Sequence, residues 1–398
     1  MDRLDAPARS ALDSPAELPS EPIKPDYGGA WVGAVLGAVE QAVQLSASPS
    51  DGAGQLPAWL PEVVAGARRA VLFVVDGMGW QALVEHREAI PVMASMQGRA
   101  ITTVVPSTTS AGLTSISTGA TPGEHGLLGY RIRVGGQVLN VLSWSNGSAS
   151  PPSPEDTQPL TPFAGQAIPV VTRSEFAETG FTRAHLRGAA FTGWRTTSTL
   201  VEHCRRLVTG AEPLIYAYYD GPDKVAHEHG LGTGYYRAEL AAVDRIVDEL
   251  LETSPDDTVV VVTADHGQVQ VGPEGARTLE PLAGLVGAMA GEGRFRSLWA
   301  RPGASAELHA AAVQHYRDVA WVFSRAQLFD EGWVAPVGAG GDRSALLRSR
   351  LGDVVLAARA PVVFVDPAQR REHLMQSQHG SLTAEEMMVP LLAARGRR

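Results

Sequence analysis

Three short, unbroken apolar runs constrain the fold of this chain more than any other feature. They lie at residues 71–75 (VLFVV), 214–219 (LIYAYY) and 258–263 (TVVVVT), and a less regular run at 101–105 is a fourth candidate. Apolar runs of this length are typical of strands that are covered on both faces, as in a parallel sheet. The runs therefore predict a mostly parallel central sheet.

The segment between the last two runs has the pattern of an amphipathic helix. One helical face would carry Tyr236, Leu240, Val243, Val247 and Leu250. A helix is also expected at residues 31–45, and Ser305 is expected to cap a helix that runs to Tyr316. Strands that alternate with helices indicate an α/β protein whose central sheet is flanked by helices.

Two regions interrupt this alternation. Residues 131–170 are rich in Ser, Pro and Gly and are interpreted as a long excursion from the sheet. Residues 275–370 contain elements of their own, including strands expected at 353–357 and 361–365, and are interpreted as an inserted lid subdomain.

The remaining residues divide into a tail and a catalytic domain. Residues 1–28 are rich in Pro, Ser and charge, which predicts a flexible tail. We expect residues 29–274 and 371–398 to form the catalytic α/β domain together.

Composition limits the classes of partner. The 33 basic and 43 acidic residues give a formal net charge of −10, which argues against a protein that coats nucleic acid or an anionic membrane. The single cysteine, Cys204, excludes an intrachain disulfide and a cysteine-based zinc cluster. The sequence shows no secretory signal and no long apolar span, so we expect a cytoplasmic protein that does not enter a membrane. The sequence gives no signal for the oligomeric state.

Acidic and histidine side chains follow the predicted strands. In chain order they are Asp76, Asp223, His227, Asp265, His266 and, near the C-terminus, His379. Because the carboxyl ends of parallel strands share one edge, these side chains are expected to meet there. Adjacent strand residues point to opposite faces, so Asp265 and His266 can serve one site only where the strand ends and Gly267 lets the chain bend.

This convergence predicts a metal centre, although each residue alone is more often a turn, cap or core residue. Without a counter-ion, two close carboxylates repel by roughly 4 kcal/mol at an effective dielectric constant near 20. Carboxylate and imidazole ligands in equal number suit zinc. Six ligands make two sets of three with open positions, as in hydrolytic sites with two metals. We therefore expect two divalent metal ions, with Zn²⁺ as the expected metal.

A candidate nucleophile lies in the segment PSTTSAG. Ser107, Thr108 and Thr109 open a stretch in which Leu113 and Ile116 have helical spacing. These hydroxyls suit ordinary helix caps, but a helix N-terminus also favours a phosphate group. Because no general base is adjacent, such a hydroxyl becomes a nucleophile where a metal deprotonates it. The formal charges of two dications, three carboxylates and one alkoxide would then sum to zero, so that a phosphodiester anion could approach.

The ordered motifs resemble those of the alkaline phosphatase superfamily, and within it the nucleotide pyrophosphatase/phosphodiesterase branch. Between about Val71 and Leu392 they read DGMG, PSTTSAG, STGATPGEHG, DKVAH, TADHG and HGSLTAEE. The resemblance implies an alkaline-phosphatase-like α/β fold and a hydrolase of phosphoric esters. The substrate would be a small-molecule phosphate ester or a nucleotide-like compound.

The resemblance also implies a role for each position. One zinc ion would be held by Asp76, Asp265, His266 and Thr109, and the other by Asp223, His227 and His379. Thr109 falls on the nucleophile position, and Thr108 is the neighbour with which it can be confused. The implied reaction is attack by the Thr109 alkoxide, a phospho-threonine intermediate, and its hydrolysis by a zinc-activated water with retention at phosphorus.

One position departs from this pattern. Gly112 stands where nucleotide-cleaving members have an asparagine that holds a phosphate oxygen, so this contact is missing or supplied elsewhere. The leading interpretation is a phosphodiesterase or nucleotide pyrophosphatase. The alternatives are a phosphomonoesterase or phosphonate hydrolase of the same superfamily, and a catalytically silent metal-binding protein.

Overall fold

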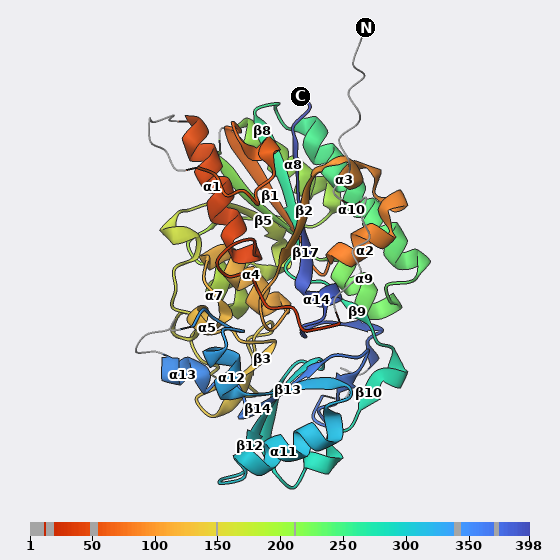
Figure 1. Cartoon of the computed structure of the whole chain (residues 1–398). Coiled ribbons are helices and arrows are strands. Elements are labelled where there is room, and N and C mark those ends of the chain that lie inside the picture. The colour runs from red at the N-terminus through yellow and green to blue at the C-terminus, as the bar shows by residue number, and fades with distance from the viewer. Residues whose placement is uncertain are drawn as a thin grey trace.

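A seven-stranded sheet forms the centre of the protein (Figure 1). The computed structural model describes residues 12, 20–47, 55–148, 150–210, 212–337, 344–369 and 374–398. The strand order is β2-β17-β8-β1-β7-β5-β6. The bounds of these strands are β1 Arg69–Val75, β2 Gln97–Thr102, β5 Pro169–Arg173, β6 Ala190–Trp194, β7 Leu214–Tyr219, β8 Thr258–Thr263 and β17 Met388–Arg395.

The strand directions confirm the prediction of a mostly parallel sheet. β1 is parallel to β7 and β8, and β5 is parallel to β6 and β7, whereas β17 is antiparallel to β8 and β2. β7 and β8 are buried along their whole length, as unbroken apolar runs require. The strand expected at 101–105 is instead β2 at 97–102. This edge strand alternates between exposed and less exposed residues, so it has no apolar run.

Long helices cover the sheet; those at residues 32–47, 109–118 and 234–253 lie where the sequence indicates helices, whereas the one at 197–209 was not predicted. They are α1 (Val32–Ala47), α4 (Thr109–Thr118), α8 (Thr197–Thr209) and α10 (Gly234–Thr253). The predicted apolar face of α10 is buried. α8 packs against α10 and against β1, and α1 packs against α4 and β1. Shorter helices are α2 Trp80–Glu85, α3 Pro91–Ser95, α5 Pro122–His125, α6 Pro154–Thr157, α7 Gly180–Leu186, α9 Gly221–His229, α12 Arg325–Asp330, α13 Ser344–Arg348 and α14 Ala384–Met387.

A second, antiparallel sheet lies within the region interpreted as an insertion and forms the lower part of Figure 1. Its order is β11-β12-β14-β13, with bounds β11 Val286–Gly291, β12 Phe295–Ala300, β14 Val354–Ala358 and β13 Ala320–Ser324. Helix α11 (Ser305–Tyr316) packs on β13 and β14, and the apolar core there is separate from the main one. Ala304, not Ser305, occupies the N-cap position of α11, and the described structure shows no side-chain cap bond there.

The other strands are short. They are β3 Arg131–Val134, β4 Gln137–Asn140, β9 Val269–Gln270, β10 Ala276–Arg277, β15 Val363–Phe364 and β16 Ser377–Gln378. β3 and β4 form a hairpin within the predicted excursion at 131–170. The division into a catalytic domain and a lid stays a prediction. Of the predicted tail, residues 1–11 and 13–19 lie outside the described residues, and the Ile23 N–H donates to the Leu382 carbonyl over 2.8 Å.

A buried ion pair joins the second sheet to the central one. Arg294, in the loop between β11 and β12, donates from Nε and Nη2 to both carboxylate oxygens of Glu386 on α14, over 2.7 and 2.8 Å. Arg294 Nη1 also donates to the carbonyls of Ala360 and Val362. Both charged side chains are fully buried. The pair therefore ties the loop to the segment that leads into β17.

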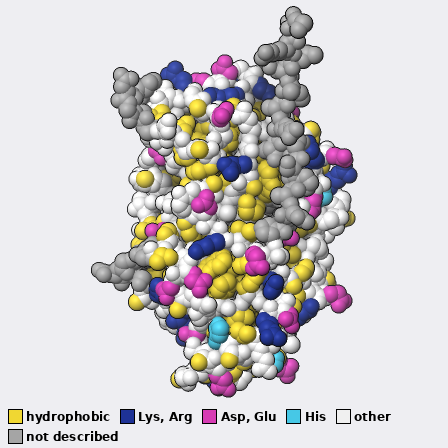
Figure 2. All heavy atoms as spheres, in the orientation of Figure 1, with side chains coloured by type: hydrophobic (Ala, Val, Ile, Leu, Met, Phe, Trp, Pro, Cys, Tyr) yellow, Lys and Arg dark blue, Asp and Glu magenta, His cyan; other side chains and the backbone are white. Residues whose placement is uncertain are grey.

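The face of the molecule shown in Figure 2 carries side chains of mixed character. On the face shown in Figure 2, acidic and basic side chains are interspersed among hydrophobic ones. Every helix among the described residues is too short or too polar to cross a lipid bilayer.

Candidate metal centre and active site

Three adjacent parallel strands bring the predicted ligands to one edge of the sheet. β8, β1 and β7 are neighbours in that order. Asp76 follows β1 directly, and Asp265 with His266 follows β8. Asp223 and His227 lie one turn apart on α9, which begins two residues after β7. The carboxyl ends of these strands meet at the same edge, as the sequence predicts.

Asp76, Asp265 and His266 form a first cluster, whose ligand atoms all lie within 4.8 Å of one another. His266 Nε2 lies 3.2 Å from Asp76 Oδ1 and 3.7 Å from Asp265 Oδ2. The Gly77 N–H donates to Asp265 Oδ1 over 3.2 Å, but Asp265 Oδ2 is buried and meets no hydrogen-bond partner among the described residues. Because an unpaired buried carboxylate oxygen is costly, this atom is suited to bind a cation.

The pKa values of the first cluster show an excess of negative charge. Burial raises the pKa of Asp265 well above its usual range, and the neighbouring Asp76 raises it further. Burial and Asp223 raise the pKa of Asp76. Burial disfavours the charged form of His266, but the carboxylates of Asp265 and Asp76 outweigh it and raise its pKa to about 10. A cation bound here would supply the positive charge that protons otherwise provide.

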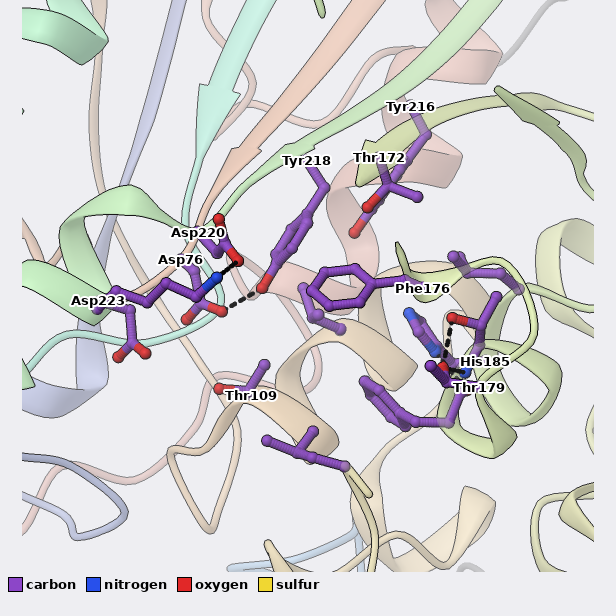
Figure 3. Close-up of a pocket in the computed structure, with 16 residues that line it drawn as sticks. Asp76, Thr109, Thr172, Phe176, Thr179, His185, Tyr216, Tyr218, Asp220 and Asp223 are labelled. Carbon is purple, nitrogen blue, oxygen red and sulfur yellow. Dashed lines mark hydrogen bonds and ion pairs between the residues drawn. The ribbon is translucent and has the colours of Figure 1, made fainter. Parts of the chain in front are cut away.

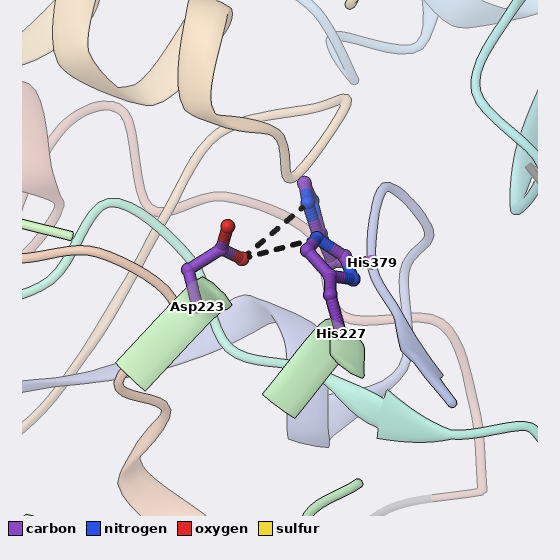
Figure 4. Close-up of side chains that lie close together, drawn as sticks. All are labelled: Asp223, His227 and His379. Atoms are coloured by element: carbon purple, nitrogen blue, oxygen red, sulfur yellow. Dashed lines mark ion pairs between the residues drawn. The ribbon is translucent and has the colours of Figure 1, made fainter. Parts of the chain in front are cut away.

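Asp223, His227 and His379 form a second cluster, again with ligand atoms within 4.8 Å of one another (Figure 4). Asp223 Oδ1 lies 3.3 Å from His227 Nε2 and 3.9 Å from His379 Nε2. His227 Nδ1 donates to the Ser377 carbonyl over 2.8 Å, and His379 Nδ1 donates to the Ser107 carbonyl over 3.0 Å. In the neutral rings these bonds leave both Nε2 atoms free to coordinate a metal beside Asp223.

The two clusters adjoin each other and Thr109. The rings of His266 and His379 stack with their centroids 3.6 Å apart. Thr109 Oγ1 lies 3.1 Å from His266 Nε2, and Thr109 lines a cavity together with Asp223, His227 and His379. All seven side chains singled out from the sequence therefore lie around one point. Their roles as ligands and nucleophile remain predictions.

The start of α4 distinguishes Thr109 from its neighbour. Thr108 occupies the N-cap position, and Thr109 is the first helical residue. The hydroxyl of Thr109 is the one in contact with the first cluster, through His266. The positive end of the helix dipole lies at the same place and favours negative charge.

Two glycines allow the chain to approach itself closely at this site. A Cβ on Gly267 would collide with the Glu385 carbonyl oxygen. The φ angle of Gly267 is not positive, so its backbone conformation does not itself require glycine. Close approach, rather than a left-handed bend, therefore requires glycine there. A Cβ on Gly112 would lie 2.7 Å from the Asp265 carbonyl oxygen and 2.9 Å from Asp265 Cβ. The structure thus leaves no room for a side chain at the position where relatives are expected to carry asparagine.

Two side chains that sequence reasoning missed, those of Tyr218 and Gln268, hold the predicted ligands. The Tyr218 hydroxyl donates to Asp76 Oδ2. Gln268 Nε2 donates to Asp223 Oδ1 over 2.8 Å, and Gln268 Oε1 accepts from the Ser377 hydroxyl. Tyr218 lies in an apolar run and has the sequence pattern of a core residue. The signal that could have identified Gln268 is its position two residues after His266.

Two cavities open onto Thr109. One, of about 230 Å³, extends from Asp76 and Thr109 to α7 (Figure 3). The other, of about 560 Å³, also has Tyr130, Glu292 and Gln378 in its wall. Thr109, Leu142 and Asp223 line both cavities, so the hydroxyl stands where they meet.

Comparisons with known proteins agree with this fold. The murine ectonucleotide pyrophosphatase/phosphodiesterase 5 aligns at 15% identity and a TM-score of 0.60, over 81% of this chain and 87% of that chain. Phosphonoacetate hydrolase from Sinorhizobium meliloti 1021, solved with phosphonoformate, aligns at 18% identity and a TM-score of 0.59, over 87% of this chain and 92% of that chain. At these identities the likeness shows the fold. A search of curated protein sequences gave no match.

A family model matches a long stretch of the chain that extends well beyond the short motifs. The model describes type I phosphodiesterase / nucleotide pyrophosphatase and matches residues 70–382. This match confirms the resemblance drawn from the motifs, together with the enzyme class that it implied, a hydrolase of phosphoric ester bonds. The chain belongs to the type I phosphodiesterase / nucleotide pyrophosphatase family.

Proposed function

We propose that this protein is a metal-dependent phosphodiesterase or pyrophosphatase that acts through a phospho-threonine intermediate on Thr109 beside two Zn²⁺ ions. The observation that carries the proposal is the position of one hydroxyl beside two three-residue clusters of carboxylate and imidazole groups. A structure of the murine relative, described as an inactive variant with alanine in place of a threonine, was solved in complex with AMP. That description supports a threonine nucleophile in this family.

The residues of both clusters fit the proposed metals. Each cluster offers nitrogen and oxygen donors, as zinc prefers, and three protein ligands leave open positions for substrate. The buried Asp265 Oδ2, which meets no partner in the described part of the chain, is a ready ligand atom. When bound, two Zn²⁺ ions would neutralise the carboxylates, lower the pKa of the Thr109 hydroxyl and stabilise negative charge on phosphate oxygens.

The residues of the chain then account for the steps at phosphorus. Thr109 Oγ1 attacks the phosphorus atom, the bond from phosphorus to one ester oxygen breaks, and the alcohol leaves. Water then attacks the phosphorus atom of phospho-Thr109, the bond from phosphorus to Oγ1 breaks, and the threonine hydroxyl is restored. Two in-line displacements give net retention at phosphorus. Throughout, the N-terminus of α4 places partial positive charge beside Oγ1.

A second candidate is a phosphomonoesterase or phosphonate hydrolase that uses the same centre. Gly112 favours keeping it, because this position offers no side chain to hold a phosphate oxygen of a nucleotide. Rates on bis(4-nitrophenyl) phosphate, 4-nitrophenyl phosphate and phosphonoacetate separate the candidates. The leading proposal expects the diester to be hydrolysed fastest.

The direct test of the nucleophile compares two neighbouring threonines. Thr109→Ala should lower turnover of a diester by at least about 1,000-fold while zinc stays bound, because the attacking oxygen is gone. Thr108→Ala, which removes the neighbouring buried hydroxyl, should keep most of the activity. Full activity in Thr109→Ala would refute the assignment. Bound zinc with no hydrolysis across a broad panel of phosphate esters would favour a catalytically silent protein.

A further inference from the structure

Ser107 joins the segment that carries Thr109 to the loop that carries His379. Its backbone pairs with that of Gly380 as an isolated antiparallel bridge, in which the Ser107 N–H donates to the Gly380 carbonyl over 3.2 Å. The Ser107 carbonyl accepts a hydrogen bond from His379 Nδ1 over 3.0 Å. One residue of the nucleophile segment is therefore bonded directly to a predicted ligand of the second cluster.

The side chain of Ser107 fixes this pairing. Its hydroxyl donates to the Ser381 carbonyl over 2.7 Å and accepts from the Gly380 N–H over 3.2 Å. Ser107, Gly380 and Ser381 are all buried, so bulk water does not compete for these bonds. Because a buried donor or acceptor that loses its partner is costly, the hydroxyl holds the loop firmly against the start of α4.

The opposite side of the loop is anchored independently of Ser107. The Ser381 N–H donates to Glu386 Oε1 over 2.9 Å, and the Ser381 hydroxyl donates to the Ala358 carbonyl over 2.7 Å. Glu386 is in turn paired with the buried Arg294. Loss of the Ser107 hydroxyl is therefore expected to loosen the loop from the nucleophile segment without unfolding it.

The position of Ser107 bears on both clusters. Because His379 Nδ1 donates to the Ser107 carbonyl, the neutral ring keeps its lone pair on Nε2, which faces Asp223 Oδ1 over 3.9 Å (Figure 4). Two residues further along the chain, Thr109 Oγ1 lies 3.1 Å from His266 Nε2 in the first cluster. A shift of Ser107 relative to the loop would change the separation of Thr109 from the second cluster.

We propose that Ser107 is a positioning residue, whose hydroxyl fixes the His379 loop against the start of α4 and so sets the separation between His379 Nε2 and Thr109 Oγ1. The inference rests on the proposed function, because it assigns a further role within the same site. Ser107 acts through His379 and Thr109 and takes no part in bond cleavage. A residue that only packs the fold would affect stability, whereas a positioning residue also affects how firmly the second metal is held.

The matched control for Ser107→Ala is Ser115→Ala. Ser115 is another fully buried serine, and its hydroxyl lies 3.0 Å from Nε2 of His125, a residue that belongs to neither cluster. Each substitution removes one buried hydroxyl and takes that partner away from buried polar groups. The melting temperature should therefore fall by about 1–4 °C in both variants.

Zinc retention by the full chain, loaded with two ions, separates positioning from packing. In a chelator competition, Ser107→Ala should hold one of the two ions about 10–100-fold less tightly than the wild type, because the ring of His379 is no longer held in place. Ser115→Ala should hold both ions as the wild type does. Equal retention of zinc in the two variants would overturn the inference.

A second measurement begins with the metal-free wild type. The Nδ1–H of His379 should give an imidazole N–H signal in the NMR spectrum that exchanges slowly with water, because it is bonded to the Ser107 carbonyl; its loss in His379→Gln assigns it. Exchange should be at least about tenfold faster in Ser107→Ala and unchanged in Ser115→Ala. A wild-type ring with its proton on Nε2, or an unchanged exchange rate in Ser107→Ala, would also overturn the inference.

Hydrolysis of a diester by the wild type and by Thr109→Ala tests the proposed function separately. If the wild type hydrolyses no phosphate ester, the proposed function fails, whereas zinc retention and the His379 signal still decide the role of Ser107. If it does hydrolyse the diester, Ser107→Ala at saturating zinc should lower kcat by at least about tenfold, because Thr109 loses its fixed separation from the second cluster. A wild-type kcat in that variant would overturn the link to Thr109.

Discussion

Substitution of Gly112 gives the most direct test of how closely α4 packs against the candidate metal centre. Replacing it by asparagine is the obvious attempt to restore the phosphate contact expected from the family. The structure predicts that this substitution lowers the hydrolysis rate and the stability of the protein. The new Cβ would lie 2.7 Å from the Asp265 carbonyl oxygen, and the contact must open by about 0.7 Å to reach 3.4 Å, where ordinary van der Waals contact begins. Thr109 and Asp265 lie on the two segments that would be pushed apart.

The size of the effect follows from this displacement. Overpacking a buried contact costs about 1–3 kcal/mol. With about 2 cal/mol/K of unfolding entropy per residue, roughly 0.8 kcal/mol/K for 398 residues, the melting temperature should fall by about 1–4 °C in Gly112→Ala and Gly112→Asn. Misplacing catalytic groups by about 1 Å costs on the order of 100-fold in rate. The hydrolysis rate on a diester should therefore fall by roughly that factor, with no gain on nucleotides.

The assay combines calorimetric unfolding with steady-state kinetics on the zinc-loaded enzyme. Gly37→Ala is the matched control, because Gly37 lies on the exposed side of α1 and a Cβ there meets nothing within 4 Å. That change should leave activity intact and stabilise the protein by about 0.5–1 kcal/mol. Wild-type stability and activity in Gly112→Ala, or higher nucleotide hydrolysis in Gly112→Asn, would refute the reasoning.

The remaining predictions concern the residues that hold the ligands and the second sheet. Gln268→Leu should weaken retention of one of two zinc ions by about 10–100-fold in a chelator competition, because Asp223 loses its 2.8 Å hydrogen bond. The control variant Gln270→Leu, at an exposed position, should retain zinc as the wild type does. Equal retention in both variants would contradict this role of Gln268. Arg294→Met should lower the free energy of unfolding by about 3–5 kcal/mol, because it leaves the Glu386 carboxylate buried without its cation, and adding Glu386→Gln should recover part of that loss in thermal unfolding. An Arg294→Met protein as stable as wild type would show that the pair contributes little.

The central strands and the site residues could be predicted because their signals are local. Full burial makes β7 and β8 continuous apolar runs, and ligand positions follow where such strands end. β2 was misplaced because an edge strand with exposed Gln97 and half-buried Gly98 has no apolar run to detect. Its partner β17, which turns part of the sheet antiparallel, was not predicted either.

The residues that support the site escaped prediction because their roles depend on tertiary contacts. Tyr218 is a strand residue whose hydroxyl reaches Asp76 across to the neighbouring β1. The apolar cavity near α7 is lined by side chains from segments that are far apart in the sequence. One of these side chains, His185, lies in no recognisable motif. The lack of space at Gly112 likewise follows from how α4 packs against Asp265.

The proposed function depends most on six side chains that are expected to hold two cations beside Thr109. Anomalous diffraction at the zinc absorption edge, from crystals of zinc-loaded protein, measures this directly. Two peaks are expected, one at Asp76, Asp265 and His266 and the other at Asp223, His227 and His379. A single peak at one cluster, or zinc bound away from both, would contradict it.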